Sequence, residues 1–355
     1  MATKGKVLVT GGAGFIGSHA AEIFAKDGHP VVVLDNLSRA KLLKKDDRNA
    51  RFNWEYLGAL PGITLREGDV RDAATVREAA LGAQVIVHAA AQTAVTTSVS
   101  DPRQDFENNV IGAFNVAEAA RLASPKPAVI FCSTNKVYGD TPNRLPLVEL
   151  ETRLELPEGH RYHQGIDTSM SIDSSTHSLF GVSKAAADLL VQEYGHYFGM
   201  PTVCFRGGCL TGPHHAGAQL HGFLAYLMKC TVTGTPYTVF GYGGKQVRDN
   251  IHSADLVACF MEFQRAPRSA AVYNIGGGRF SNCSMIEAIE ACERISGREL
   301  DHSLSDEARI GDHRWWISDL AQFRADYPDW EPRYGIEEIL GEIHSENVER
   351  WAEAA

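Results

Sequence analysis

Residues 7–17 read V-L-V-T-G-G-A-G-F-I-G, a short apolar run followed at once by glycines at positions 11, 14 and 17. The apolar run predicts a buried strand, and the amphipathic stretch from Ile16 to Asp27, closed by Gly28, predicts a helix. Glycines at this spacing allow the backbone to turn tightly and to approach a pyrophosphate, whose charge then lies at the helix N-terminus. The stretch therefore predicts a strand, turn and helix that bind a dinucleotide.

Apolar β-branched runs and helical stretches continue to alternate beyond this unit. Further strands are predicted at residues 31–34, 85–88 and 128–131, and a helix at 109–122. Continuous apolar strands are typical of a parallel sheet covered on both faces, so the fold class is α/β with a doubly wound parallel Rossmann sheet. From about Thr211 the pattern changes to helices, loops and short strands at 237–240 and 272–275. We expect a dinucleotide-binding Rossmann domain over residues 1–210 and a smaller α/β substrate lobe over 211–355, with the chain crossing between them.

The composition limits the classes of partner. The chain has 355 residues, which at ~150 residues per domain suggests two folding units. Its 34 Lys and Arg against 44 Asp and Glu leave a net charge of -10, which disfavours a nucleic-acid surface. No apolar run approaches the ~18 residues that a membrane helix needs, and the first residues lack a signal-peptide core. We expect a cytoplasmic protein whose partners are small molecules.

The cysteines and histidines give no metal signal. Seven cysteines are scattered without a C-x-x-C pair, several of them in apolar stretches, and they are interpreted as reduced core residues. His214 and His215 are adjacent, and two neighbouring histidines do not face one metal ion on a helix. No metal site is predicted.

Asp35 ends the second predicted strand, at a distance from the glycines that is typical of NAD-binding proteins. Its carboxylate can accept hydrogen bonds from both hydroxyls of the adenosine ribose and would repel a 2'-phosphate. The sequence therefore favours NAD as the cofactor, although the nearby Arg39 is compatible with NADP. Asp69 and Val70 are expected beside the adenine. The small residues at 89–91 let a cofactor lie close, and they would serve helix packing equally well.

These elements together resemble the extended short-chain dehydrogenase/reductase family, which contains nucleotide-sugar epimerases and dehydratases. The resemblance runs through residues 11–17, 35–39, 69–72, 88–92, 109–112, 133–139, 248–252 and 309–312. Residues 133–140, 165–167 and 314–319 are most similar to a group of CDP-sugar 2-epimerases within it. The resemblance implies an NAD-dependent epimerase that inverts a carbon of a nucleotide sugar by transient oxidation to a keto sugar and re-reduction. We also expect a homodimer.

The resemblance also assigns the cofactor contacts. They are Gly11, Gly14, Phe15, Ile16, Gly17, Asp35, Asn36, Ser38, Arg39, Asp69, Val70, Ala89, Ala90, Ala91, Asn109 and Lys184.

The catalytic positions follow the family with one departure. Ser133 and Thr134 occupy the place of the hydroxyl that hydrogen-bonds the reacting sugar oxygen. Lys184 matches the Lys that holds the nicotinamide ribose and lowers the pKa of a Tyr four residues earlier, and that Tyr is the base. Here the Tyr position is Phe180, whose phenyl ring neither gives nor takes a proton.

Three explanations of Phe180 stay open at this point. Another group acts as the base, the chain binds NAD without turnover as a sensing protein, or the phenylalanine is an engineered replacement of a tyrosine. We favour a relocated base. The candidates are Tyr138, His177, Asp167 and Lys184 itself, whose amine would need a lowered pKa.

The substrate contacts come from the second half of the chain. Arg248 and Arg309 match positions that clamp the nucleotide diphosphate in relatives, where forked guanidinium donors suit phosphate oxygens. Asp312 is expected to accept a hydrogen bond from the ribose or base. Cys209 stands where the family often has an Asn that contacts the diphosphate. Dehydration is disfavoured, because the residues after Thr134 are Asn and Lys instead of the Asp-Glu pair of the dehydratases.

Overall fold

The structure is a computed structural model and describes residues 4–38, 48–93, 95–213, 222–307 and 311–352. The chain forms two compact units that interleave in the sequence. Unit 1 consists of residues 1–137, 178–206 and 257–273, and unit 2 of residues 138–177, 207–256 and 274–355. One crossing, after Arg206, falls near the domain boundary expected at residue 210, and the other crossings divide the expected domains further.

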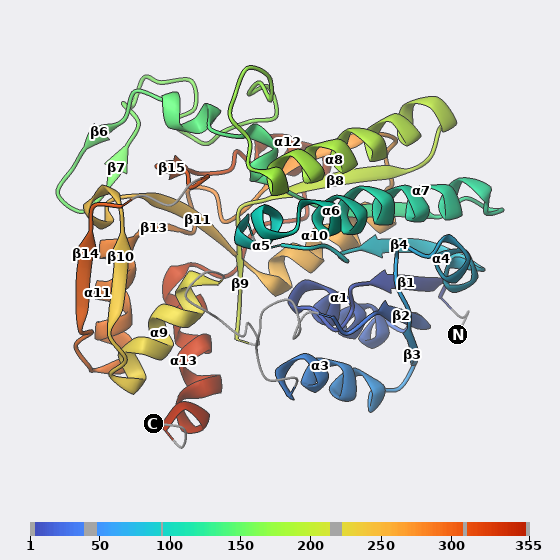
Figure 1. Cartoon of the computed structure of the whole chain (residues 1–355), viewed down its shortest axis with the longest axis horizontal. Coiled ribbons are helices and arrows are strands. Elements are labelled where there is room, and N and C mark those ends of the chain that lie inside the picture. The colour runs from blue at the N-terminus through green and yellow to red at the C-terminus, as the bar shows by residue number, and fades with distance from the viewer. Residues whose placement is uncertain (1–3, 39–47, 94, 214–221, 308–310, 353–355) are drawn as a thin grey trace. The chain divides into compact units, whose positions relative to one another are not determined.

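Unit 1 is built on a seven-stranded sheet of order β12-β8-β5-β4-β1-β2-β3 (Figure 1). The strands are β1 Lys6–Thr10, β2 Val31–Asp35, β3 Ile63–Glu67, β4 Ala83–His88, β5 Ala128–Thr134, β8 Thr202–Gly207 and β12 Ala271–Ile275. All pairs from β3 through β2, β1 and β4 to β5 are parallel. The chain runs outward from β1 to β3 and then returns to β4 on the other side of β1. This order confirms the doubly wound α/β sheet, with a topological switch point between β1 and β4.

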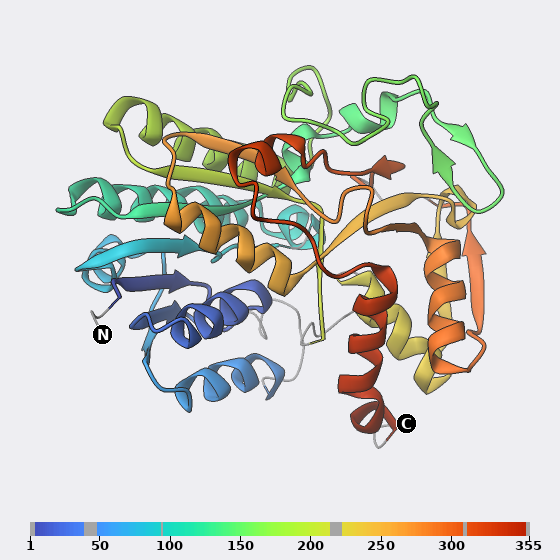
Figure 2. The ribbon, with the colours of Figure 1, turned by 180° about the vertical axis from the view of Figure 1, so that it is seen from behind.

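Helices cover both faces of this sheet (Figures 1 and 2). Leu8, Ile86 and Val129 share an apolar cluster with residues of α4, α7 and α8. Because strand side chains alternate between faces, Val7 and Val9 point to the opposite face, where α1 packs on β1 and β2. The helical elements are α1 Phe15–Lys26, α3 Arg48–Gly58, α4 Ala73–Ala80, α5 Val95–Ser100, α6 Pro102–Phe106, the π-helix η1 Glu107–Ile111, α7 Gly112–Leu122, the 3₁₀ turn η2 Asn135–Tyr138, α8 Leu179–Phe198 and α10 Ser253–Arg265.

The run at residues 272–275 corrects one expectation. The sequence pattern places it among the short strands of the second lobe, but it belongs to β12, at the edge of the large sheet beside β8. A strand of this length carries no signal for its partner, so its place could not be deduced from its position in the chain. The run at 237–240 does form a strand of unit 2, β10.

Unit 2 combines small sheets with helices, some of which enclose an apolar core. Strands β9, β11, β13 and β15 form one sheet, β10 pairs with β14, and β6 pairs with β7. Helices α9, α11 and α13 enclose the core. The elements are η3 Thr141–Arg144, β6 Val148–Glu149, β7 Leu154–Glu155, β9 Cys209–Thr211, α9 Phe223–Thr233, β10 Tyr237–Phe240, η4 Tyr242–Gly244, β11 Val247–His252, β13 Asn282–Ser284, α11 Met285–Ser296, β14 His302–Ser305, β15 Trp315–Trp316, α12 Ala321–Asp326 and α13 Ile336–Ala352.

The long segment 140–176 is tied to the rest of unit 2. Arg279 donates hydrogen bonds of 2.8 and 3.1 Å to the carboxylate of Glu155. Ile166 forms a parallel bridge with Ser318, and its carbonyl accepts a bond of 2.8 Å from Asn274. The segment therefore has defined contacts although it contains little regular structure.

Within the described ranges, no helix is both long and apolar enough to span a bilayer. The same ranges hold no group of three His, Cys, Asp or Glu side chains that could bind a metal ion, and His214 and His215 lie outside them. All seven cysteines are free thiols, and five of them are buried.

Candidate active site

The glycine-rich turn forms a tight cradle between the ends of β1 and β4. Gly11 has φ +72°, and a Cβ there would lie 2.5 Å from the backbone nitrogen of Ala90. A Cβ on Gly17 would collide with the carbonyl oxygen of Gly11. The backbone N–H of Ala89 donates 3.1 Å to the carbonyl of Thr10, which joins the two strand ends at the switch point. Open α/β sheets bind their ligands at this place.

Helix α1 begins directly after this turn. Gly14 is its N-cap, and no side chain caps the helix. Phe15 is buried in the first turn beside His19, and Ile16 is half-buried. An α-helix N-terminus with glycines at its approach suits a pyrophosphate, so these residues fit the diphosphate of a dinucleotide.

The Asp35 carboxylate is held at the end of β2, facing the glycine-rich turn. Its Oδ2 accepts a hydrogen bond of 3.0 Å from the Ala13 backbone N–H, and its Oδ1 accepts one of 2.8 Å from Leu37. Backbone donors therefore fix the carboxylate beside the cradle. A carboxylate here fits the two ribose hydroxyls of NAD better than a 2'-phosphate.

The other expected adenosine contacts form one hydrogen-bonded group. Asn36 donates 2.9 Å to Asp69, and its Oδ1 accepts bonds from the backbone and hydroxyl of Ser38 at 3.1 and 2.7 Å. A side-chain hydrogen bond from Arg71 lowers the pKa of Asp69 to about 2, so the carboxylate is ionised at neutral pH. Val70 is buried after it. Arg39 lies outside the described residues.

Asn109 lies in the π-helix and is fully buried. Its Oδ1 accepts 2.9 Å from the backbone of Gln92, and its Nδ2 donates 2.9 Å to Ser183. The amide therefore ties the segment after Ala89–Ala91 to helix α8. In this structure Asn109 supports the loop that borders the cofactor cradle.

Lys184 is buried in α8. Its Nζ donates 2.7 Å to the carbonyl of Cys132 and lies 4.1 Å from the ring centroid of Phe131. Burial lowers the pKa of Lys184 to about 8. Phe180 is one helical turn earlier and is also buried. Helix α8 thus brings to the site an amine that can lose its proton near neutral pH, but no phenol.

Ser133 and Thr134 have different surroundings at the end of β5. The buried Ser133 hydroxyl donates 2.5 Å to the carboxylate of Asp188. Thr134 is half-buried, and its hydroxyl accepts 3.3 Å from the backbone of Lys136. That contact leaves the Thr134 hydroxyl able to donate a hydrogen bond.

The remaining base candidates lie in unit 2 and have partners there. Tyr138 is fully buried, and its hydroxyl donates 2.8 Å to Asn274. Asp167 accepts bonds of 2.8 and 2.5 Å from the backbone and hydroxyl of Ser169. His177 Nδ1 lies 3.2 Å from the carbonyl oxygen of Ser175.

The predicted substrate residues also belong to unit 2. Arg248 is half-buried on β11, opposite Trp316 of β15, and its guanidinium donates 2.9 Å to the carbonyl of Val247. Within the described part of the chain it forms no ion pair with a carboxylate. Asp312 is half-buried, and its carbonyl accepts 3.0 Å from Asn143. Arg309 lies outside the described residues.

Sequence reasoning missed two buried carboxylates that support the site. Asp188 pairs with Arg206 at 2.8 Å. Asp105 accepts bonds of 2.8 Å from Gln92 and 2.5 Å from Ser183, and burial raises its pKa. The signal was their spacing. Asp188 lies four residues after Lys184 on one face of α8, and Asp105, at the end of α6, lies four residues before Asn109 of the π-helix.

The chain is similar to known proteins over almost its whole length. A model of the NAD-dependent epimerase/dehydratase family matches residues 7–276. The CDP-paratose 2-epimerase of Salmonella typhi is 30% identical over 353 residues, which are 96% of this chain and 98% of that protein. The UDP-glucose 4-epimerase of Neisseria meningitidis serogroup B is 28% identical, over 94% of this chain and 95% of that protein.

A solved structure shows the same fold with the cofactor. The UDP-glucose 4-epimerase of Thermus thermophilus, in complex with NAD, superposes with a TM-score of 0.75 at 26% identity, over 99% of this chain and 100% of that chain. The family match covers the cradle, Asp35 and Lys184. The chain therefore belongs to the NAD-dependent epimerase/dehydratase family, and its cofactor is NAD.

Proposed function

We propose that the chain is a nucleotide-sugar epimerase with a relocated base, and that its substrate is related to CDP-paratose. The observation that carries the proposal is that the chain has both the complete glycine-rich cradle for NAD and the residues Thr134 and Lys184. Similarity to the CDP-paratose 2-epimerase over almost both full lengths supports the substrate class. Asn135 and Lys136 support epimerisation over dehydration, since an amide and an ammonium cannot replace an acid and base pair of carboxyl groups.

NAD, when bound, supplies reversible hydride transfer, so that a sugar alcohol is oxidised to a keto sugar and re-reduced on its opposite face. The glycine-rich turn and Asp35 would hold its diphosphate and ribose. The Thr134 hydroxyl would donate a hydrogen bond to the reacting sugar oxygen. Lys184 would also hold the nicotinamide ribose, as its counterpart does in the family.

We assign the base to Lys184. Its pKa of about 8 makes an appreciable fraction neutral at physiological pH, and the neutral amine has a lone pair that can take the proton of the sugar hydroxyl. Its hydrogen bond to Cys132 holds Nζ in place while it does so. Tyr138 is less suited, because its hydroxyl is already donated to Asn274 in a fully buried position.

Arg248 and Arg309 are proposed to bind the diphosphate of the nucleotide sugar, and Asp312 its ribose or base. A half-buried guanidinium without a carboxylate partner among the described residues, as at Arg248, suits an anionic ligand.

The test uses the purified protein with CDP-, UDP-, dTDP- and GDP-sugars. The proposal expects a transient absorbance of reduced nicotinamide near 340 nm and, by NMR, an epimeric product with at least one of them. Accumulation of a keto sugar without the epimeric product would indicate another reaction of the family. Tight NAD binding with no signal from any sugar would favour the second candidate, an NAD-sensing protein, which Phe180 also supports.

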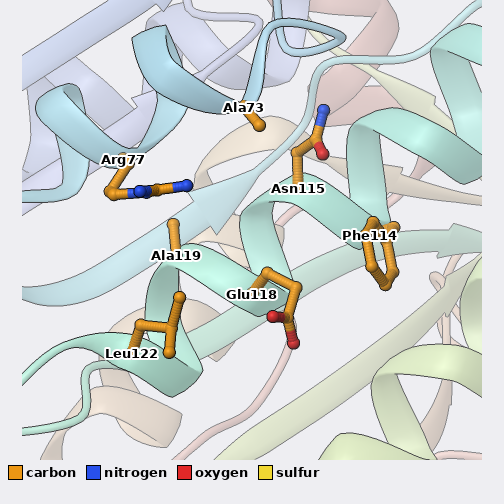
Figure 3. Close-up of a pocket in the computed structure, with 7 residues that line it drawn as sticks. All are labelled: Ala73, Arg77, Phe114, Asn115, Glu118, Ala119 and Leu122. Carbon is orange, nitrogen blue, oxygen red and sulfur yellow. The ribbon is translucent and has the colours of Figure 1, made fainter.

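We also propose a homodimer formed through helices α7 and α8. The two helices pack together and expose apolar side chains, among them Phe114 and Leu122 on α7 and Val182 and Leu189 on α8. Exposed apolar patches of this kind mark interaction surfaces. A hollow of about 160 Å³ lies between α4 and α7 and contains no predicted cofactor residue. Figure 3 draws the side chains that line it, which are Ala73, Arg77, Phe114, Asn115, Glu118, Ala119 and Leu122.

Light scattering tests the dimer. The native chain should have twice the monomer mass, and Val182→Glu should halve it. Leu304→Glu, at an exposed apolar residue of β14, is the matched control and should leave the mass unchanged. A monomeric native chain contradicts the proposal.

A further inference from the structure

We propose that Asp188 is a positioning residue, which holds the Ser133 hydroxyl and thereby fixes the end of the strand that presents Thr134. The inference rests on the proposed function. Asp188 itself would touch neither substrate nor cofactor.

The Asp188 carboxylate joins three elements of unit 1. It is fully buried and accepts hydrogen bonds of 2.5 Å from Ser133, 2.6 Å from Gln192, and 3.1 and 2.8 Å from Nε and Nη2 of Arg206. Asp188 and Gln192 belong to α8, Ser133 to β5 and Arg206 to β8, which neighbours β5 in the sheet. The carboxylate thus fixes helix α8 against two adjacent strands.

Helix α8 holds two successive residues of β5. Lys184 and Asp188 lie one turn apart on the same helix face. Lys184 binds the carbonyl of Cys132, and Asp188 binds the hydroxyl of the next residue, Ser133. Thr134 follows as the last residue of β5. Its position is therefore set by the residues that α8 fixes before it.

The same contacts divide the roles of the two hydroxyls. Successive side chains of a strand point to opposite faces, so only one of Ser133 and Thr134 can face α8. Ser133 does so and is occupied by Asp188. We therefore assign Ser133 to the contact with Asp188 and not, as its sequence position predicts, to a contact with the substrate. Thr134 would then be the residue that donates a hydrogen bond to the sugar oxygen.

A buried ion pair is weak evidence of a gain in stability, because desolvation of both charges offsets their attraction. Precise orientation of a catalytic group is the better reason for such a cluster, since reacting groups must be held to within about 0.5 Å. Asp188 and Arg206 provide this orientation through hydrogen bonds that fix both carboxylate oxygens.

The first experiment neutralises the pair without leaving one charge alone, with Asp188→Asn and Arg206→Gln combined. Using a sugar that the native enzyme converts, we expect kcat to fall by about 10- to 100-fold, as for a misplacement of about 1 Å. KM should stay within about twofold and bound NAD should be unchanged, because in this proposal Asp188 would contact neither ligand. The combined Glu262→Gln and Arg265→Gln variant, which removes an ion pair on α10, is the control and should leave kcat unchanged. Unchanged kcat in the Asp188 and Arg206 variant overturns the proposal.

The second experiment adds Ser133→Ala to the native chain and to the neutralised pair. We expect a several-fold loss of kcat in the native background and no further loss in the other, because the hydrogen bond is already disrupted there. An equal loss in both backgrounds means that Ser133 acts on the substrate itself and overturns the proposal.

If the combined Asp188→Asn and Arg206→Gln variant does not fold, two single variants test the proposal instead. The proposal expects Thr134→Ala to lose at least tenfold more kcat than Ser133→Ala, and equal losses overturn it. If the native protein converts no sugar at all, the proposed function fails separately. The urea unfolding midpoints of native, Ser133→Ala, Asp188→Asn and double-variant chains then decide: non-additive shifts support the coupling of Ser133 to Asp188, and additive shifts overturn it.

Discussion

The Nζ atom of Lys184 donates a hydrogen bond of 2.7 Å to the backbone carbonyl of Cys132. This bond ties the centre of helix α8 to strand β5 two residues before Thr134. It also holds the amine in a buried environment that lowers its pKa to about 8. Under the proposed function, this arrangement gives a member of the epimerase/dehydratase family that lacks the usual tyrosine a group for proton transfer.

The first prediction concerns the pH dependence of turnover. Only the neutral amine of Lys184 can accept a proton, and it forms as the pH rises through about 8. We therefore expect kcat to increase with pH on a limb whose apparent pKa is near 8, measured with a saturating nucleotide sugar. Lys184→Arg keeps a positive charge that does not titrate, so it should abolish this limb together with most of the activity. If kcat of Lys184→Arg still increases with pH near 8, Lys184 is not the base.

The second prediction concerns the specificity of the cofactor site. Asp35→Ala should weaken NAD binding by roughly 1–3 kcal/mol, the usual value of hydrogen bonds to a charged group. Loss of the carboxylate should also reduce the preference for NAD over NADP. Calorimetry with both nucleotides measures the two effects, and Asp72→Ala, at the cap of α4, is the control. Equal or tighter NAD binding by Asp35→Ala would refute the ribose assignment.

Much of the nucleotide-binding half could be predicted because its signals are local. The glycines of residues 11–17 require tight backbone contacts, and Asp35 ends a strand that begins with a β-branched run. Both features follow from covalent geometry and strand periodicity. The same local logic predicts the alternation of strands and helices from β1 to β5.

The features that the sequence did not predict depend on contacts between residues that are distant in the chain. Asp188 and Ser133 are 55 positions apart, and no pattern near either one indicates their hydrogen bond. The partner of β12 is likewise set by tertiary packing, which is why the sequence pattern places this strand in the other lobe. The hydroxyl of Tyr138 is a candidate base by sequence alone, and only the fold brings it to Asn274, 136 positions away.

The third prediction concerns the substrate. Arg248→Ala and Arg309→Ala should each raise KM for the nucleotide sugar by about tenfold or more, because each loses charge-assisted bonds to the diphosphate. Bound NAD, measured by absorbance after denaturation, should stay the same. Arg265→Ala, on the exposed end of α10, serves as the control. Loss of NAD from a folded Arg248 variant would place this arginine at the cofactor instead.

The fourth prediction is a stability effect in unit 2. Asp249 is fully buried, accepts 2.8 Å from the Ser318 backbone, and has its pKa raised to about 6 by burial. Between about pH 4 and 6 the folded chain therefore binds more protons than the unfolded chain, so this group lowers stability as the pH rises through that window. The effect is on the order of 3 kcal/mol, at about 1.4 kcal/mol for each unit of pKa.

Asp249→Asn should remove this part of the pH dependence. Urea unfolding of both chains at about pH 4.5 and pH 7.5 measures it. The native chain should lose more stability between the two values than the variant. Equal changes in the two chains would mean that Asp249 does not titrate in this range.

We propose that the substrate is turned over without a tyrosine base, and the ratio of kcat between Phe180→Tyr and the native protein decides between this proposal and a site that has lost its base. A base at Lys184 predicts measurable native turnover and a gain of less than about tenfold from the new hydroxyl, together with a changed pH profile. A site that has lost its only base would instead gain the ~10²–10⁴ that a positioned base contributes. A gain of that size on Phe180→Tyr would rule out Lys184 as the base.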